Sequence, residues 1–172
     1  MRRSSATLWV IGFLLLAAWA GWDLAPGELS GTPRGAGLEA RVVAVVDGDT
    51  VRVRVDGREE TVRYIGVDTP ETKRPGSPVE CFGPAASAAN QRLVDGQQVR
   101  LEVGEEQRDR YGRLLAYAYR ANDGRLVNQT LVREGYARPL AIEPNVGHAE
   151  AFSALADEAR AAGRGLWSAC GG

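Results

Sequence analysis

The segment VRYIGVDTPE, residues 62–71, places an arginine among apolar positions. Residues Val62 to Val67 alternate in the period-two pattern of a half-buried strand. Pro70 ends that strand because proline has no N–H to give to a ladder. The alternation puts Arg63 on the same face as Val67, where a guanidinium is costly unless it pairs with an anion or opens into a cleft. The segment therefore predicts a charged site at the end of a strand.

The preceding segment, DTVRVRV, also places a charged residue on the apolar face of a strand, here an acidic one. Asp49 is on the same face as the three valines. The dipeptide Asp56-Gly57 predicts a hairpin, so that this strand pairs antiparallel with the next one. Asp49, Arg63 and Asp68 are then expected at one mouth of the sheet. Arg63 and Asp68 are five residues apart, which puts them on opposite faces of a straight strand unless Gly66 bends it.

The first function that these residues could serve is to bind a divalent cation through oxygen ligands. Asp49 and Asp68, with the Thr69 carbonyl and water, suit Ca²⁺ or Mg²⁺ and not a transition metal. In the alternative interpretation, Asp49 is part of an ordinary turn and Asp68 forms an Asx turn before Pro70. The spacing alone leaves both interpretations open.

The second function that these residues could serve is to bind a phosphate through arginine side chains. Arg63 is one candidate, and Arg113 is another, presented with Arg110 and Tyr111 by a tight turn that begins at Asp109. Hydrolysis of a phosphodiester requires that its charge be neutralised and that a water be oriented and deprotonated. Arginine, metal and carboxylate together can do this. Each arginine taken singly can equally be an ordinary solvated side chain.

Five short strands and three helices are expected to position these residues. One helix interrupts the strands, and the other two follow them. Apolar periodicity and turn signals predict strands over 39–46, 49–55, 60–67, 97–103 and 114–119, and helices over 83–94, 127–134 and 148–162. Five short strands with helices gathered late in the chain indicate a five-stranded Greek-key barrel of the OB type, packed with about three α-helices in an α+β domain. We place this domain at residues 38–170.

The overall composition limits the classes of protein that fit. The chain has 172 residues, which favours one domain, with 21 Lys and Arg against 22 Asp and Glu. A net charge of −1 argues against a generally basic nucleic-acid binder, so phosphate recognition must be local. One histidine and two cysteines exclude most zinc sites.

The N-terminal residues 1–22 have the features of a targeting segment. Two arginines precede an uncharged run over residues 4–22, and the motif Ala18-Trp19-Ala20 resembles a signal-peptidase site. We interpret 1–22 as a cleaved signal peptide or an uncleaved membrane anchor, and the Gly- and Pro-rich residues 23–37 as a linker. Both interpretations put the domain outside the cytoplasm, secreted or periplasmic.

The two cysteines, Cys81 and Cys170, form an even pair in a chain that we expect to be exported. A bridge between them would close a loop of 170 − 81 = 89 residues. The chain-entropy model gives such a bridge about 4 kcal/mol of stability. The alternative is two buried free thiols.

Five ordered motifs resemble the staphylococcal nuclease (thermonuclease) family. They are VDGDT at 46–50, RYIGVDTPE at 63–71, FGPxAS at 82–87, DRYGR at 109–113 and VNxxLVRxG at 127–135. The resemblance runs from about residue 40 to Trp167. It implies an OB-fold barrel with three helices that cleaves DNA and RNA with Ca²⁺, breaks the 5′-oxygen to phosphorus bond and leaves 3′-phosphates.

The resemblance also implies a role for each site residue. The implied calcium ligands are Asp49, Asp68 and the Thr69 carbonyl; the general base is Glu71; the phosphate clamp is Arg63 and Arg113; and the substrate contacts are Arg110 and Tyr111. Where the family's type member has two tyrosines, one of which stacks on the base, this chain has Leu140, Ala141 and Ile142.

Three further expectations concern partners. The substrate is nucleic acid, the N-terminal segment is a possible membrane tether, and the chain is a monomer. The alternative function is a non-catalytic OB-fold module that binds nucleic acid or protein, since this fold often binds without chemistry. Intact Asp49, Asp68, Glu71, Arg63 and Arg113 favour the enzyme.

Overall fold

The computed structural model describes residues 37–72 and 78–170. The strands are β1 (Leu38–Val45), β2 (Thr50–Val55), β3 (Arg58–Tyr64), β4 (Val67–Asp68), β5 (Gln98–Arg108), β6 (Leu114–Arg120) and β7 (Arg138–Pro139). The helices are α1 (Gly83–Val94), α2 (Val127–Arg133), α3 (Ala149–Ala161) and α4 (Leu166–Ala169).

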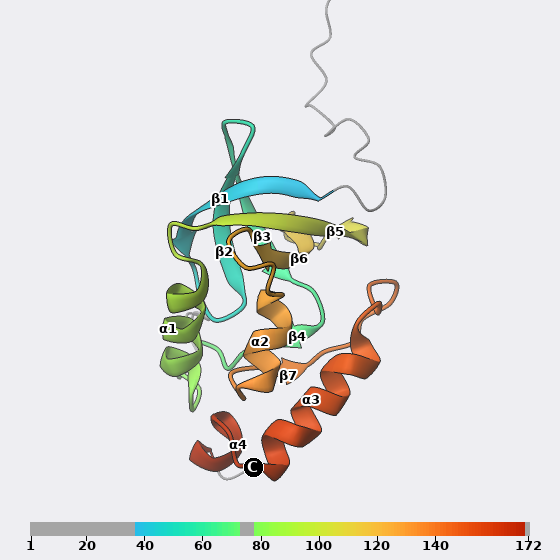
Figure 1. The fold of residues 1–172 in the computed structure, drawn as a ribbon. Coiled ribbons are helices and arrows are strands. Elements are labelled where there is room, and N and C mark those ends of the chain that lie inside the picture. Colours follow the sequence, from blue (N-terminus) through green and yellow to red (C-terminus); the bar gives the residue numbers. More distant parts are fainter. Residues whose placement is uncertain (1–36, 73–77, 171–172) are drawn as a thin grey trace, which may run out of the picture. The chain divides into compact units, whose positions relative to one another are not determined.

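Five strands form a closed barrel in the order β1-β2-β3-β6-β5 (Figure 1). Neighbouring strands are antiparallel except β3 and β6, which are parallel, and β1 pairs with β5 to close the barrel. The predicted five-stranded barrel is confirmed. The parallel pair brings the end of β3 beside the start of β6, which follows the turn that carries Arg113.

The alternation in β2 sets which side chains enter the barrel. Val51, Val53 and Val55 are buried, whereas Arg52 and Arg54 are exposed. Val55 pairs with Arg58 across the two-residue turn 56–57, whose residues have φ of 47° and 80°. Positive φ at both central residues is the type I′ geometry that favours Asp-Gly. The predicted hairpin is therefore confirmed.

The prediction of one strand over 60–67 is wrong. β3 ends at Tyr64, and β4 is a separate two-residue strand that pairs with β7. Gly66 makes the break: its φ is +79°, and a Cβ there would lie 2.8 Å from the ring of Phe152. Only glycine fits both conditions without strain. β5 also continues to Arg108, five residues beyond the expected end of its strand.

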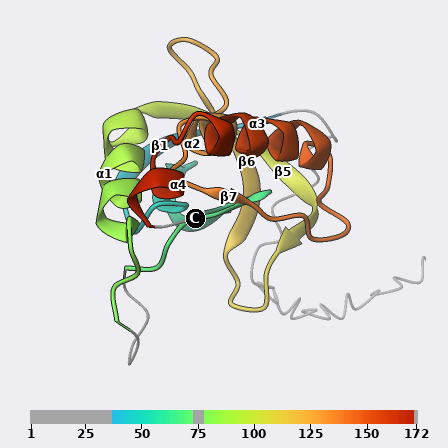
Figure 2. The same ribbon diagram turned by 90° about the horizontal axis from the view of Figure 1, so that it is seen from below.

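Helices α1, α2 and α3 gather at one end of the barrel (Figures 1 and 2). The α3 stripe of Phe152, Ala156 and Ala159 is buried, and it belongs with the barrel residues to the hydrophobic interior. The three expected helices are present, and α4 is an additional short one. The helices cover the end of the barrel opposite to the β2–β3 hairpin (Figure 1).

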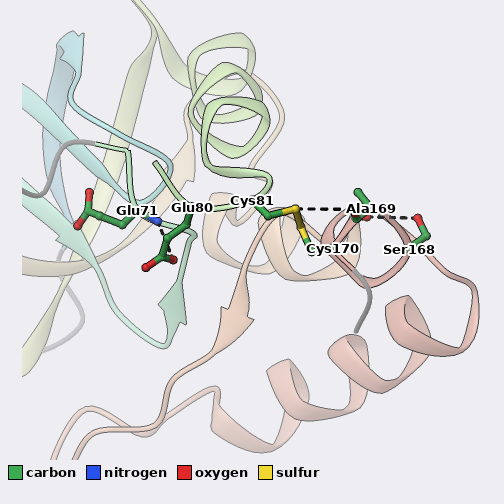
Figure 3. Close-up of a disulfide and its surroundings, with 7 residues drawn as sticks. Glu71, Glu80, Cys81, Ser168, Ala169 and Cys170 are labelled. Carbon is green, nitrogen blue, oxygen red and sulfur yellow. Dashed lines mark hydrogen bonds between the residues drawn. A yellow bond between two sulfur atoms is a disulfide. The ribbon is translucent and has the colours of Figure 1, made fainter. Parts of the chain in front are cut away.

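The predicted disulfide is present between Cys81 and Cys170, with 5.8 Å between the Cα atoms. It ties the segment before α1 to the end of α4 (Figure 3). The signal peptide or anchor expected at 1–22, and the linker at 23–37 apart from Gly37, lie outside the described residues. Within 37–72 and 78–170, no helix is long and apolar enough to cross a membrane.

Candidate active site

One cavity of about 290 Å³ is lined by all the polar residues that the sequence analysis selected. These eight are Asp49, Arg63, Asp68, Thr69, Glu71, Arg110, Tyr111 and Arg113. They come from the residue before β2, the end of β3, β4 and the segment after it, and the β5–β6 turn. Asp47 and Glu80, which the analysis did not select, line the same cavity.

Asp49 is buried with only 5% of its surface exposed, and it is held from several sides. Its Oδ1 accepts from the Thr50 hydroxyl at 3.0 Å and faces Arg63 Nε at 3.1 Å. Its Oδ2 accepts from the backbone N–H and the hydroxyl of Thr69, both at 2.9 Å. Charge-assisted bonds of this kind offset the cost of burying a carboxylate.

Arg63 connects the two carboxylates. Its Nη1 donates to the carbonyls of Tyr64 and Val67, at 2.8 and 2.7 Å, and its Nη2 donates to Asp68 Oδ1 at 3.0 Å. With Nε against Asp49, one guanidinium joins the end of β3 to β4 across the Gly66 bend. The bend thus brings together two residues whose odd spacing would separate them on a straight strand.

These contacts give Arg63 a structural task besides the phosphate binding expected of it. Most of its N–H groups donate to protein oxygens, and its side chain is only 14% exposed. Arg113 is more accessible, with 31% of its side chain exposed. Of the two arginines, Arg113 is the better placed to meet an incoming phosphate.

Asp109 fixes Arg113. Its Oδ1 accepts from the backbone N–H groups of Tyr111 and Arg113 at 2.9 and 3.0 Å, and its Oδ2 contacts Arg113 Nε and Nη2 at 2.7 Å. Partial burial pushes the pKa of Asp109 upward, but these hydrogen bonds outweigh burial and hold the pKa below its usual value. Sequence reasoning placed Asp109 at the start of the turn but did not pair it with Arg113, although an Asp that opens a turn before Gly112 is a known Asx-turn signal.

Tyr111 stands at the rim between two cations. It is 68% exposed, and its hydroxyl lies 2.6 Å from Arg110 Nη2. The guanidinium carbons of Arg110 and Arg113 lie 4.8 and 5.5 Å from its ring centroid. An exposed ring flanked by guanidinium groups can contact both the phosphate and the sugar of a nucleotide.

Two buried asparagines hold the backbone beneath the cavity, and the sequence analysis gave neither of them this role. Asn90 of α1 donates to the carbonyl of Asp47 at 2.9 Å. Asn128 of α2 donates to the carbonyl of Ile65 at 2.8 Å and accepts from the N–H of Ala118 at 3.0 Å. Both are 0% exposed. A polar residue inside an otherwise apolar helix face is the signal that could have found them.

The cavity concentrates negative charge. Its acidic residues are Asp47, Asp49, Asp68, Glu71 and Glu80. Burial, followed by the nearby Asp49 charge, raises the pKa of Asp47 to about 6. Burial also raises the pKa of Asp68, and the charges of Asp49 and Glu80 raise it further against the opposing effect of Arg63.

This donor set fits a hard divalent cation, which would relieve the crowding of carboxylates. Within the part of the chain that the structure describes, no three His, Cys, Asp or Glu side chains converge as a metal site. A cation would therefore depend on Asp49 and Asp68, completed by a carbonyl such as that of Thr69 and by water.

A second cavity of about 460 Å³ shares Arg63, Arg110, Tyr111 and Arg113 with the first. Its apolar lining residues include Ile65, Leu115, Leu140 and Ile142. Leu140 and Ile142 are 38% and 58% exposed, although both are apolar. A charged cavity thus adjoins an apolar one, as phosphate and base adjoin in a nucleotide.

Comparisons with known proteins show the family to which the chain belongs. The family described as "Staphylococcal nuclease homologue" matches residues 61–169. Similar proteins include "Endonuclease YncB" of Bacillus subtilis (strain 168), 44% identical over 128 residues, which are 73% of this chain and 60% of the relative. "Thermonuclease" of Staphylococcus hyicus is 39% identical over 128 residues, 74% of this chain and 75% of the relative.

A third similar protein, "Uncharacterized endonuclease" of Escherichia coli O157:H7, is 37% identical over 133 residues, 77% of this chain and 79% of the relative. The match to YncB thus covers less than two thirds of that protein. The family match includes Arg63, Glu71 and Arg113 but begins after Asp49.

Proposed function

The chain belongs to the family of staphylococcal nuclease homologues, and from this premise we propose that it is a nuclease, a hydrolase of phosphodiester bonds in DNA, RNA or both. The observation that carries the proposal is one cavity lined by three arginines and five carboxylates. Such a cavity offers both a binding site for a phosphate and a base for water.

Glu71 is the proposed general base, and Arg113 and Arg63 are the proposed phosphate clamp. In this mechanism Glu71 accepts a proton from a water as the water oxygen bonds to phosphorus. The bond from phosphorus to the 5′-oxygen breaks, the 5′-oxygen takes up a proton from water to become a hydroxyl, and the other product carries a 3′-phosphate. Arg113 neutralises charge that develops on the phosphoryl oxygens, and its pairing with Asp109 orients it in advance.

We propose that Asp49, Asp68 and the Thr69 carbonyl hold Ca²⁺. The cation would supply Lewis-acid stabilisation of the charged phosphoryl group. The chain itself sets the distance between the two carboxylates through Arg63, and it orients Asp49 through Thr69. These contacts support a hard-oxygen site and not a site for a transition metal.

The adjoining apolar cavity is the proposed subsite for a base and its sugar. Tyr111 and Arg110 at the shared rim would contact the phosphate and sugar. Leu140 and Ile142 would contact the base through aliphatic groups, without aromatic stacking. Because stacking on an aromatic side chain is worth about 1–3 kcal/mol per base, we expect weak binding of single nucleotides.

We also propose that the domain works outside the cytoplasm as a monomer. The Cys81–Cys170 bond supports an oxidising compartment. The uncharged run over residues 4–22 supports export through a signal peptide or an anchor. Mass measurement of the N-terminus after export would separate removal of this run from its retention as a tether.

The deciding experiment incubates the purified 172-residue chain with single- and double-stranded DNA and RNA, with Ca²⁺, with Mg²⁺ and with a chelator. We expect cleavage with Ca²⁺, its loss with chelator, and 3′-phosphate ends on the products. Glu71→Gln should abolish most cleavage and leave the circular dichroism spectrum unchanged. Substrate binding without cleavage by the unaltered chain would instead support the non-catalytic binding module.

A further inference from the structure

Glu80 and Glu71 are joined at two points. The backbone N–H of Glu71 donates to Glu80 Oε2 at 3.1 Å, and the backbone N–H of Glu80 donates to the carbonyl of Glu71 at 2.9 Å. Figure 3 shows the Glu80 carboxylate beside the backbone nitrogen of Glu71. Both glutamates line the charged cavity. Glu80 therefore holds the main chain of Glu71 with its side chain and its own main chain.

The start of α1 lies directly against the same segment. A Cβ on Gly83 would lie 2.9 Å from the carbonyl oxygen of Glu71, 3.1 Å from that of Pro70 and 2.8 Å from Thr72 Cγ2. Gly83 also donates to the carbonyl of Glu80 at 3.0 Å. Only a residue without a side chain allows this approach. Residues 80–83 thus form a cradle around the backbone of Glu71.

The disulfide holds this cradle from the other side. Cys81, next to Glu80, is bonded to Cys170 at the end of α4. The start of α4 is fixed to the loop after α2, because Leu166 donates to the carbonyl of Gly135 at 2.9 Å and is fully buried. Glu80 and Cys81 themselves are exposed and lie outside helices and strands. An exposed segment without regular structure opens easily unless something else restrains it.

We propose that Glu80 is a positioning residue for Glu71, and that the Cys81–Cys170 bond keeps Glu80 in place, so that the cleavage rate depends on the disulfide. The inference rests on the proposed function, in which Glu71 is the base. A base must lie within hydrogen-bond reach of the water that it deprotonates, and small displacements of catalytic groups are costly. The bridge acts on the rate through backbone geometry and does not contact the substrate.

Reduction of the bridge by a dithiol tests the dependence directly. A thiolate of the reagent attacks one cysteine sulfur, and its second thiol then closes the reagent into a cyclic disulfide. Two electrons and two protons pass to Cys81 and Cys170, which become free thiols. The double variant Cys81→Ala/Cys170→Ala also lacks the bridge, without a reductant and without free thiols.

The kinetic test compares Glu80→Ala, Glu80→Gln and the double cysteine variant with the unaltered 172-residue chain in Ca²⁺. We expect Glu80→Ala to lower kcat about tenfold or more, with KM changed less than about twofold, because a displacement of about 1 Å can cost about a hundredfold. Glu80→Gln keeps an oxygen acceptor for the N–H of Glu71 and should retain most of kcat. Reduction of the disulfide and the double cysteine variant should both lower kcat, as Glu80→Ala does.

Two controls separate positioning from general loss of stability. Val99→Ala shortens a fully buried side chain of β5, and it should lower the Tm without changing kcat at a temperature where the variant is folded. In a Glu71→Gln background, Glu80→Ala should cause no further loss of kcat, because the group that it positions is already disabled.

Three results would overturn the inference. They are an unchanged kcat in Glu80→Ala, an unchanged kcat after complete reduction, or the same proportional loss from Glu80→Ala in both backgrounds. Each of these can occur while the oxidised chain still cleaves its substrate, and the proposed function then stands. Failure of the unaltered oxidised chain to cleave would refute the function itself.

Discussion

Replacement of Arg63 by alanine tests the central contact of the site. In Arg63→Ala, the carboxylate of Asp49 stays buried without the Arg63 guanidinium, and Asp68 loses its ion pair with the same group. Removal of one member of a buried ion pair costs about 3–5 kcal/mol. The Asp68 side chain is 58% exposed, so its pair adds at most about 1 kcal/mol.

The expected loss lies at the lower end of that range. Asp49 keeps its bonds from Thr50 and from the N–H and hydroxyl of Thr69, which still compensate part of its charge. We therefore expect Arg63→Ala to lower the free energy of unfolding by about 3 kcal/mol. For a domain of this size that loss corresponds to a fall in Tm of roughly 10 °C.

Urea unfolding followed by tryptophan fluorescence, in the presence of chelator, measures this loss. The control is Arg54→Ala, which removes an arginine from an exposed ion pair with Glu59 and should cost less than about 1 kcal/mol. In an Asp49→Asn background the cost of Arg63→Ala should fall to about 1 kcal/mol, because no buried charge is left behind. An equal cost in both backgrounds, or a loss below about 1 kcal/mol for Arg63→Ala alone, would refute the reasoning.

Three further predictions concern the rim and the cation. Arg113→Gln should lower kcat about 10²–10³-fold with only a small fall in Tm, because Asp109 keeps its backbone hydrogen bonds; steady-state cleavage and thermal melts measure this, and unchanged turnover would remove Arg113 from the clamp. Because the folded pKa of Asp109 lies below its ordinary value of 3.8, its ionised form stabilises the protein above pH 3.8, and that contribution is lost as the pH falls through the folded value. The stability difference between the unaltered chain and Asp109→Asn, measured by urea unfolding, should therefore shrink as the pH falls below 3.8, and a difference independent of pH would contradict this. Ca²⁺ at 100 times its Kd should stabilise the fold by about 2.7 kcal/mol, an effect that chelator reverses; a Tm indifferent to Ca²⁺ would argue against the Asp49 and Asp68 site.

Local sequence patterns, such as turn dipeptides and apolar alternation, predicted much of the barrel. The Asp-Gly turn at 56–57 and the alternating valines of β2 are set by backbone sterics and burial, so the hairpin follows from the sequence. Helix α1 begins at Gly83 with Pro84 in its first turn and ends at Val94, as expected. The convergence of Asp49, Arg63 and the other predicted residues on one cavity agrees with their expected place at one mouth of the sheet. Their catalytic roles remain predictions.

Contacts between distant segments explain what the sequence analysis missed. β5 continues to Arg108 because its last residue pairs with Leu114, and because Arg108 donates to Glu60 at 3.0 Å. Residues 105–108 of β5 are exposed, so no apolar alternation marks them. The break at Gly66 was anticipated only as a possible bend, since the ring that excludes a side chain comes from Phe152, far along the chain. The support of Glu71 by Glu80 likewise depends on tertiary structure.

The parallel pairing of β3 with β6 has a consequence for how the molecule acquires activity. It joins residues 62–64 to residues 114–116, and α1 and β5 lie between these two strands in the sequence. Contacts so distant in sequence form late and slowly during folding. In a nascent or partly folded chain, Arg63 and Arg113 would thus lie apart, and we expect such a chain not to cleave nucleic acid. Recovery of cleavage after dilution from denaturant should consequently report completion of the barrel, later than any signal from the helices.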